Sequence, residues 1–335
     1  MVNKIVSVGL KALLWGFAGT GLASLLLVGL VAWPLRQPPE LASISQSARA
    51  VDRSNMPGLD RFQARDGTWL AYRHYPPSAV AANTPVAILV HGSSGSSTSV
   101  HALAAALAGH GVETYAIDIR GHGGSGARGD IGHVGQLEED MADLVALIRK
   151  AAPTAPLTLI GHSSGGGFAL RVAGSSIQHL FARTILLAPF LGAFAPTNQP
   201  NWGGWANADI PRIAALTTLR GIGIDCCEAL PVLAFAVPAH SEQRQVPVYT
   251  ERLRSNFGVH PDFRTDLATA SQPISIFAGA ADELMRSDKY AEAVHAVAPS
   301  VIVKLIDGVD HMGIVNSPRA ISMIAEDVAK FGASS

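Results

Sequence analysis

Short apolar runs recur along the chain, and stretches with helical periodicity separate several of them. Each run is mostly apolar, as in the strands of a sheet that is buried on both faces. The runs lie at residues 86–90, 112–117, 156–160, 184–187, 273–277 and 301–306. Apolar residues between 137 and 148 fall on one helical face, and Ser317-Pro318 starts a second amphipathic helix. Strands that alternate with helices predict an α/β fold, with a mostly parallel central sheet and helices on both faces.

Two further segments complete the predicted layout. Residues 61–65 and 69–73 alternate between polar and apolar positions around an Asp-Gly turn, which predicts a hairpin. Residues 190–266 interrupt the rhythm of strands and helices, because prolines punctuate them and they contain no lysine. We therefore expect residues 190–266 to form a cap, inserted between two parts of one core. These parts are residues 61–189 and 267–335.

The N-terminal residues are strongly apolar. No charged residue occurs across residues 12–33, and this length suits a helix that crosses ~30 Å of hydrocarbon. Residues 1–36 are therefore predicted to anchor the chain in a membrane, with the remainder on the extracytoplasmic side. The alternative is a signal peptide that is cleaved on secretion, although its apolar core would be unusually long. Residues 37–60 are rich in Pro, Ser and Ala and are predicted to be a tether.

Composition and charge exclude several classes of function. The 335 residues include 25 basic and 26 acidic ones, for a net charge of −1, and no basic stripe is present to bind nucleic acid. The two cysteines, Cys226 and Cys227, are adjacent and cannot join distant loops. No His/Cys cluster has the spacing of a metal site. The sequence therefore predicts no metal and implies no protein partner.

The candidate chemistry centres on the segment Gly161-His162-Ser163-Ser164-Gly165. It follows the apolar run at 156–160 and precedes a segment of small residues. A strand, then G-x-S-x-G, then a helix is typical of a nucleophile elbow, in which the serine lies at a strained, tight turn. The alternative is a glycine-rich loop without chemistry. Ser163 is the predicted nucleophile.

A serine hydroxyl needs a base to take its proton, and the base needs a carboxylate to orient it. The candidate base is His311, in the loop after the last predicted strand. The candidate acid is Asp282, which follows the strand at 273–277, because sites lie at the carboxyl ends of strands in such sheets. Three nearby carboxylates compete with it for this role: Glu283, Asp307 and Asp310.

The oxyanion of an acyl-transfer intermediate needs two fixed N–H donors. Ser164 directly follows the nucleophile, and its backbone N–H is one candidate. The second is expected from the loop after the strand at 86–90, where we assign it to the backbone of Ser93, with Ser94 as the alternative. His91 closes the same strand and is interpreted as a structural residue.

Several motifs occur in an order that resembles a known family. They are His91-Gly92-Ser93, the segment from Asp118 to Ser125, the elbow, Gly279-Ala280-Ala281-Asp282 and Asp310-His311. From about Arg61 to Phe331 the chain resembles the α/β-hydrolases, in particular the lysophospholipase, monoacylglycerol lipase and serine aminopeptidase-like group. The segment from Asp118 departs from the usual form by one extra glycine before Ser125.

The resemblance implies a Ser163–His311–Asp282 triad, no cofactor, and hydrolysis of an ester or amide through an acyl-enzyme. It also implies a structural role for His122.

Three functions remain open. The first is a membrane-anchored esterase that acts on an acyl lipid such as a monoacylglycerol or lysophospholipid. The apolar run at 229–237 fits this function weakly, because it could equally be a buried cap helix. The second is an aminopeptidase or amidase, for which a carboxylate in the cap would bind the amine: Glu228, Glu242 or Glu251. The third is a catalytically silent binding protein.

Overall fold

The computed structural model describes residues 34–77, 84–224, 226–238 and 245–334, together with Gly29. The predicted anchor, residues 12–33, lies outside the described residues except for Gly29. Among the helices that the structure does describe, none is both long and apolar enough to span a membrane.

The predicted strands assemble into one eight-stranded sheet, in the order β1-β2-β4-β3-β5-β6-β10-β11. The strands are β1 (Asp60–Gln63), β2 (Trp69–Tyr75), β3 (Val86–Val90), β4 (Glu113–Ile117), β5 (Leu157–His162), β6 (Arg183–Leu187), β10 (Ile274–Gly279) and β11 (Ile302–Ile306). The predicted hairpin is present, since β1 pairs with β2 in antiparallel register, and β2 also pairs antiparallel with β4. All other pairs are parallel, which confirms the predicted α/β fold.

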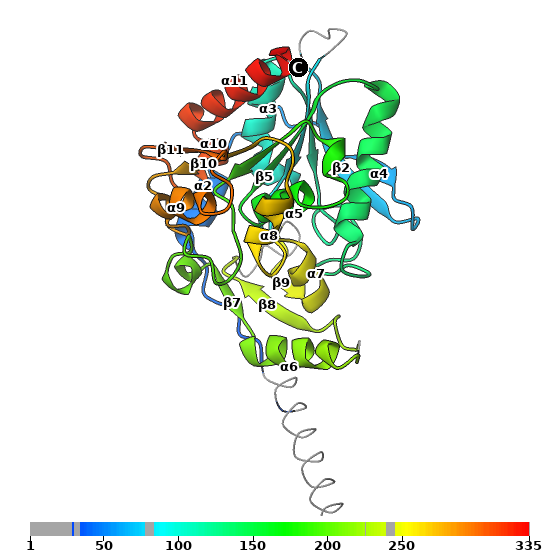
Figure 1. The fold of residues 1–335 in the computed structure, drawn as a ribbon, viewed down its shortest axis with the longest axis vertical. Coiled ribbons are helices and arrows are strands. Elements are labelled where there is room, and N and C mark those ends of the chain that lie inside the picture. Colours follow the sequence, from blue (N-terminus) through cyan, green and yellow to red (C-terminus); the bar gives the residue numbers. More distant parts are fainter. Residues whose placement is uncertain (1–28, 30–33, 78–83, 225, 239–244, 335) are drawn as a thin grey trace, which may run out of the picture.

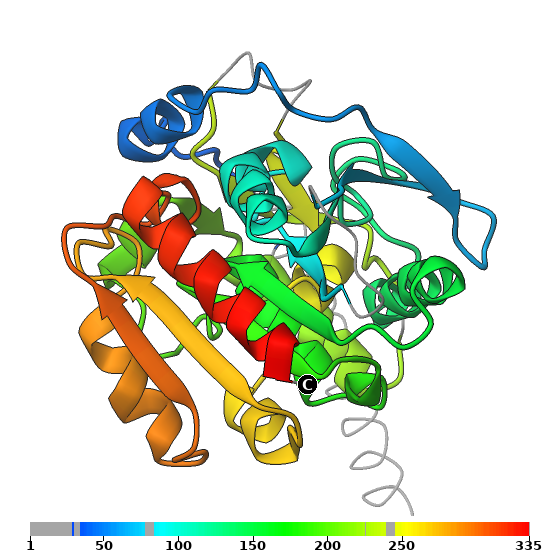
Figure 2. The same ribbon diagram turned by 90° about the horizontal axis from the view of Figure 1, so that it is seen from above.

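Helices cover the sheet because its central strands carry apolar side chains on both faces. Every residue of β3, β5, β6 and β10 is buried. The surrounding helices are α3 (His101–Gly109), α4 (Gln136–Ala151), α5 (Ser164–Ala173), α8 (Phe263–Thr269), α9 (Tyr290–His295), α10 (Gly313–Asn316) and α11 (Pro318–Ser334). Helices α3 and α11 pack against each other, and α5 lies against β5 and β6 (Figure 2). The two helices predicted from periodicity are α4 and α11.

The segment 190–266, which we call the cap, contains a second sheet. Its strands are β7 (Ala206–Ala208), β8 (Pro231–Phe235) and β9 (Val248–Thr250), and its helices are α6 (Ile210–Gly221) and α7 (Glu251–Asn256). Strand β8 lies in the middle of this antiparallel sheet, below the main sheet in Figure 1. The alternative of a buried cap helix at residues 229–237 is therefore excluded, because residues 231–235 of this run form strand β8, which pairs with β7 and β9.

The segment predicted as a tether is partly folded onto the cap. It contains the helix α2 (Ala42–Arg49). Before this helix, the backbone N–H of Leu41 donates to the carbonyl of Ala236 at 3.0 Å, and the Asn207 side chain donates to the carbonyl of Arg36 at 2.7 Å. The N-terminal segment thus enters the described domain along the cap.

Candidate active site

Ser163 occupies the sharp turn between β5 and α5. Its φ of 55° and ψ of −119° lie in a region that is strained for a residue with a side chain, which costs about 1–3 kcal/mol. The backbone N–H of Ser163 donates to the carbonyl of Leu187 at 2.9 Å, which holds the turn against the sheet. A Cβ on Gly161 would lie 2.0 Å from the Gly165 carbonyl oxygen, and one on Gly165 would lie 2.3 Å from that of His91. The strand–turn–helix arrangement expected from the motif is present, and both of its glycines are sterically required.

His311 and Asp282 form a buried pair. The Nδ1 of His311 and the Oδ2 of Asp282 are 2.9 Å apart. The other carboxylate oxygen, Oδ1, accepts the backbone N–H groups of Leu284 and Met285, each at 2.8 Å. Because Asp282 follows β10 and His311 follows β11, adjacent parallel strands bring the two residues together. Nδ1–H donates to the carboxylate, so Nε2 of the neutral imidazole is the proton acceptor.

Each member of this pair alters the pKa of the other. Burial alone would favour the neutral imidazole, but the negative charge and hydrogen bond of Asp282 outweigh it and raise the pKa of His311. Burial alone would likewise raise the pKa of the carboxyl, yet His311 and two backbone N–H donors hold the pKa of Asp282 below its ordinary value. The pair is therefore suited to stabilising a protonated imidazole during a reaction.

The carboxylates of Glu283 and Asp310 have other partners, and Asp307 is bonded through its backbone carbonyl rather than its carboxylate. Glu283 Oε2 accepts the backbone N–H of His311 at 3.0 Å rather than its ring. Asp310 Oδ1 accepts the backbone N–H of Gly313 at 2.5 Å, at the start of α10. The backbone carbonyl of Asp307 accepts a hydrogen bond from Arg319 at 3.3 Å. Of these carboxylates and Asp282, the structure brings only Asp282 to the His311 ring.

The loop after β3 lies against the nucleophile. A Cβ on Gly92 would be 3.1 Å from the Cβ of Ser163, and Ser93 lines the same cleft as Ser163 and His311. The backbone N–H groups of Ser93 and Ser164 have no acceptor in the part of the chain that the structure describes. The alternative donor, the N–H of Ser94, is occupied by the hydroxyl of Tyr249 at 2.6 Å. The geometry therefore favours Ser93 over Ser94 as an oxyanion donor.

The ring of His91 is bonded to the backbone on both sides, which agrees with the structural role interpreted from the sequence. Its Nδ1–H donates to the carbonyl of Gly92 at 2.7 Å, and its Nε2 accepts the backbone N–H of Ile119 at 3.2 Å. Burial lowers the pKa of His91, so the ring is neutral and both nitrogens are used.

Sequence reasoning overlooked His162, which lies between Gly161 and Ser163 at the first variable position of the G-x-S-x-G pattern. Its Nε2 donates to the backbone carbonyl of His311 at 3.1 Å, and the two rings are 4.9 Å apart. Burial lowers the pKa of His162 to about 3, so it remains neutral. His162 therefore fixes the loop that carries the candidate base. Its position beside Ser163 was the only signal in the sequence.

The cleft beside Ser163 is predominantly apolar. The space between its walls, part of it open to solvent, is about 440 Å³. Its large apolar residues come from four separate segments: Ile44 of α2, Trp205 of the cap, Leu284 and Met312. Ile44 was not predicted as a site residue, because it lies 119 positions before Ser163 in the segment interpreted as a tether.

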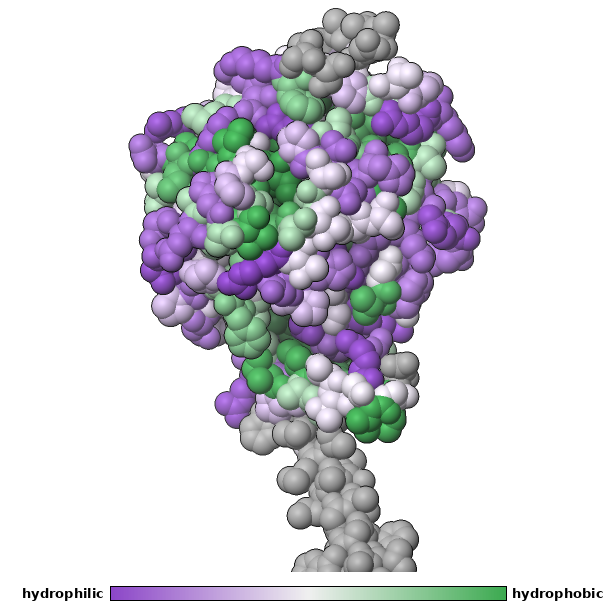
Figure 3. Space-filling view, in the orientation of Figure 1, coloured by the Kyte–Doolittle hydropathy of each residue, from purple (hydrophilic) through white to green (hydrophobic). Residues whose placement is uncertain are grey.

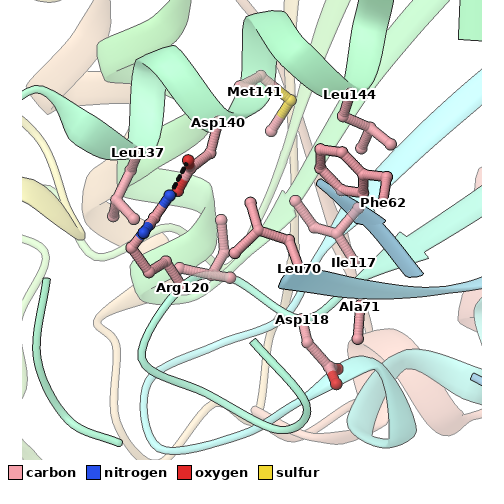
Figure 4. A pocket seen from close by; sticks show the side chains of 11 residues that line it. Phe62, Leu70, Ala71, Ile117, Asp118, Arg120, Leu137, Asp140, Met141 and Leu144 are labelled. Carbon is pink, nitrogen blue, oxygen red and sulfur yellow. Dashed lines mark hydrogen bonds and ion pairs between the residues drawn. The ribbon is translucent and has the colours of Figure 1, made fainter. Parts of the chain in front are cut away.

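A second cavity lies between β2, β4 and α4 (Figure 4). It is mainly apolar, and its two charged partners Arg120 and Asp140 point toward one another at 2.6 Å. Arg120 also bonds Asp66 at 2.8 Å. This cavity contains no paired nucleophile and base among its described residues and shares no lining residue with the Ser163 cleft. We interpret it as a packing defect beside a structural ion pair.

The structure has a strained serine between a buried parallel strand and a helix, and an acid and a histidine after the last two strands. This arrangement defines the α/β-hydrolase class. The chain belongs to the Hydrolase_4 family, serine aminopeptidase S33, whose model matches residues 82–317.

The chain is similar over part of its length to monoacylglycerol lipases. The chain is 30% identical to the monoglyceride lipase of Homo sapiens over 156 residues, which are 46% of this chain and 49% of that protein. It is 31% identical to the monoacylglycerol lipase of Mycolicibacterium smegmatis over 109 residues, 32% of this chain and 39% of that one. The matches thus span about half or less of these relatives' lengths.

The same fold occurs in a soluble variant of monoglyceride lipase from Saccharomyces cerevisiae, solved in complex with a substrate analogue. The TM-score is 0.63 at 17% identity, over 84% of this chain and 96% of that one.

Proposed function

We propose that the protein is a serine hydrolase that cleaves carboxylic esters through an acyl-enzyme. The observation that carries this proposal is the 2.9 Å Asp282–His311 pair in the cleft that Ser163 lines. His311 Nε2 takes the proton from Ser163 as its oxygen attacks the ester carbonyl, and the N–H groups of Ser93 and Ser164 bind the resulting oxyanion. The imidazolium then protonates the leaving alcohol. A water molecule activated by the same histidine releases the acid.

The lining of the cleft favours an uncharged lipid ester as substrate. The residues that line it include no Lys, Arg, Asp or Glu among those the structure describes. Its apolar side chains suit an acyl chain, and Ser99 and Gln245 can hydrogen-bond a hydroxylated head group. The similarity to monoglyceride lipases supports a monoacylglycerol in particular. A lysophospholipid would place a charged head group in a site with no charged partner among the described lining residues.

The test is hydrolysis by the purified full-length protein in detergent. We expect turnover of monoacylglycerols at a kcat/KM well above that for lysophosphatidylcholine, and turnover of short p-nitrophenyl esters. Inertness toward all three, in folded protein, would overturn the proposal.

Two of the three carboxylates expected to bind a substrate amine in the aminopeptidase alternative lie away from the cleft. Glu228 accepts hydrogen bonds from Arg220 at 2.8 Å, and the buried Glu251 is held by Arg254 at 2.7 Å. Neither carboxylate lines the cleft, and Glu242 lies outside the described residues. The expectation that Glu228 or Glu251 binds a substrate amine is therefore wrong, because arginines already neutralise both. We expect no release of naphthylamine from proline-naphthylamide.

Ile44 is expected to influence the choice of acyl chain. Replacing Ile44 with alanine removes apolar contact from one wall of the cleft, so kcat/KM for long-chain monoacylglycerols should fall by about tenfold. Hydrolysis of p-nitrophenyl acetate should change by less than about twofold, because a two-carbon acyl group is too short to need that wall. Kinetics across a series of chain lengths would measure the effect. The matched control is Ile302→Ala, at an exposed isoleucine on β11. An equal loss for short and long esters would contradict a role in chain selection.

We further propose that residues 12–33 anchor the protein in a membrane, with the catalytic domain on the extracytoplasmic side. The uncharged run itself supports this, and so do Ile210, Ile222 and Ile224, which are exposed at or just beyond the ends of the cap helix α6. Figure 3 shows apolar surface at the cap end of the molecule. Full-length protein should stay with membranes after alkaline carbonate extraction and be digested by protease added to intact cells. Release by carbonate would indicate secretion after cleavage, and protection from protease would reverse the orientation.

A further inference from the structure

Three hydrogen bonds join the cap to the loop that carries Ser93. Trp205 Nε1 donates to Ser93 Oγ at 2.9 Å, and the backbone N–H of Val246 donates to the carbonyl of Ser94 at 2.9 Å. The backbone N–H of Ser94 donates to the hydroxyl of Tyr249, on β9, at 2.6 Å. Both backbone polar groups of Ser94 are thus bonded by residues of the cap. The cap, rather than the main sheet, holds this part of the loop.

Ser94 needs such support because its backbone is strained. Its φ of 63° lies in the left-handed region, which residues with a side chain rarely adopt, and the residue is wholly buried. If the Tyr249 hydroxyl were absent, the N–H of Ser94 would be a buried donor without an acceptor, which costs about 1–3 kcal/mol. A shift of the Ser93–Ser94 peptide would relieve both penalties.

The Tyr249 hydroxyl is itself held in one orientation. It accepts from Ser94 and donates to Nε2 of His122 at 2.5 Å, and His122 Nδ1 donates to the carbonyl of Arg120 at 3.3 Å. Burial lowers the pKa of His122 well below its ordinary value and raises the pKa of Tyr249, so both side chains stay neutral. Because the backbone N–H of Ser94 can only donate, it fixes the donor and the acceptor in each of these three linked hydrogen bonds.

The aromatic side chains around Tyr249 fix its ring independently of its hydroxyl. Its ring centroid is 4.6 Å from that of Phe235 in an edge-on arrangement, and the Phe257 ring lies 6.4 Å away. A phenylalanine at this position would keep these ring contacts and lose only the oxygen. The hydrogen bond to Ser94 can therefore be removed without removing the packing.

We propose that Tyr249 is a positioning residue for the oxyanion hole: its hydroxyl, oriented by His122, fixes Ser94 and so holds the neighbouring Ser93 N–H toward the substrate oxygen. This inference rests on the proposed esterase function. Since an oxyanion donor stabilises the transition state more than the bound ester, a displaced Ser93 N–H lowers kcat more than it changes KM. The cap thereby contributes to catalysis as well as to the wall of the cleft.

The test is Tyr249→Phe in the full-length protein. We expect kcat for a p-nitrophenyl ester to fall by about 10- to 100-fold, less than deletion of an oxyanion donor itself would cause, with KM changed by less than about threefold. A trifluoromethyl ketone, which adds to the serine to form a negatively charged hemiketal, should lose affinity by the same factor as kcat/KM. A purely structural role would not produce this parallel loss. Wild-type kcat, or an unchanged inhibition constant for the ketone, would overturn the proposal.

Two further variants make the outcome unambiguous. Tyr115→Phe removes a different tyrosine hydroxyl, bonded to Glu113 at 2.9 Å on β4, and should leave kcat unchanged. If Tyr249→Phe does not fold, His122→Phe keeps an aromatic ring beside Tyr249 and removes the nitrogen that orients its hydroxyl. The same parallel loss of kcat/KM and ketone affinity is then expected. Absence of that loss would also overturn the proposal.

Failure of the inference is distinguishable from failure of the proposed function. If the wild-type protein neither hydrolyses esters nor reacts with a fluorophosphonate, the esterase function itself fails. If the wild type does both and Tyr249→Phe equals it, only the positioning role of Tyr249 is lost.

Discussion

Replacing Ser163 with alanine is expected to lower kcat for ester hydrolysis by roughly 10⁶-fold, to the background left by binding and the oxyanion donors. The reason is that alanine has no oxygen to attack the carbonyl, so no acyl-enzyme forms. A labelled fluorophosphonate, which reacts with activated serines, should modify the wild-type protein in detergent extracts and not Ser163→Ala. Ester hydrolysis and labelling measured on the same preparations would test both expectations.

Ser322→Ala is the matched control, because it removes a serine hydroxyl on α11 that bonds Glu326 at 3.5 Å, away from the cleft. This variant should label and turn over like the wild type. Persistent labelling of Ser163→Ala would mean that another serine is the nucleophile. Equal hydrolysis by Ser163→Ala and the wild type would exclude the acyl-enzyme mechanism.

Replacing Asp282 with asparagine should lower kcat by roughly 10⁴-fold while preserving the shape of the side chain. Asparagine can no longer compensate the positive charge on His311 as the imidazole takes the proton. Its amide can also donate to Nδ1, which would place the ring proton on Nε2 and block the base. The rates should be measured on short p-nitrophenyl esters, with near-ultraviolet circular dichroism to confirm that the variant is folded.

The same substitution should change the pH dependence. His311 acts as a base only when neutral, so kcat/KM of the wild type rises with pH through the pKa of His311. The negative charge of Asp282 holds the pKa of His311 above the ordinary 6.5. Asp282→Asn removes that charge, so the rise of kcat/KM with pH should occur at lower pH in this variant. An unchanged profile would contradict the pairing of these two residues.

Glu283→Gln provides the control for charge in the same loop. The glutamine side chain would still offer an oxygen to the backbone N–H of His311, the contact that Glu283 makes at 3.0 Å. We therefore expect less than about a tenfold loss of kcat. A loss equal to that of Asp282→Asn would show that Glu283, rather than Asp282, supplies the orienting charge.

The local pattern of the sequence was sufficient to predict the core strands and the elements that carry the candidate residues. Continuous apolar runs predicted the central strands, because a strand covered on both faces leaves no position for polar side chains. The spacing of glycines around Ser163 predicted the elbow, since its geometry is confined to five consecutive residues. Asp282 and His311 were placed after strands of one parallel sheet, and such a sheet brings its carboxyl ends to one edge.

Contacts between distant segments were decided only by the tertiary structure. The apolar pattern of residues 229–237 fits a buried helix and a buried strand equally well. Pairing with β7 and β9 decides in favour of the strand. Ile44 reaches the cleft, and Tyr249 meets Ser94 and His122, across more than 100 positions of sequence. No local periodicity encodes such contacts, because they depend on how the cap and the N-terminal segment pack onto the finished core. The sequence by itself therefore determined the elements and the candidate chemistry, whereas the walls of the cleft and the support of the oxyanion loop arose from packing.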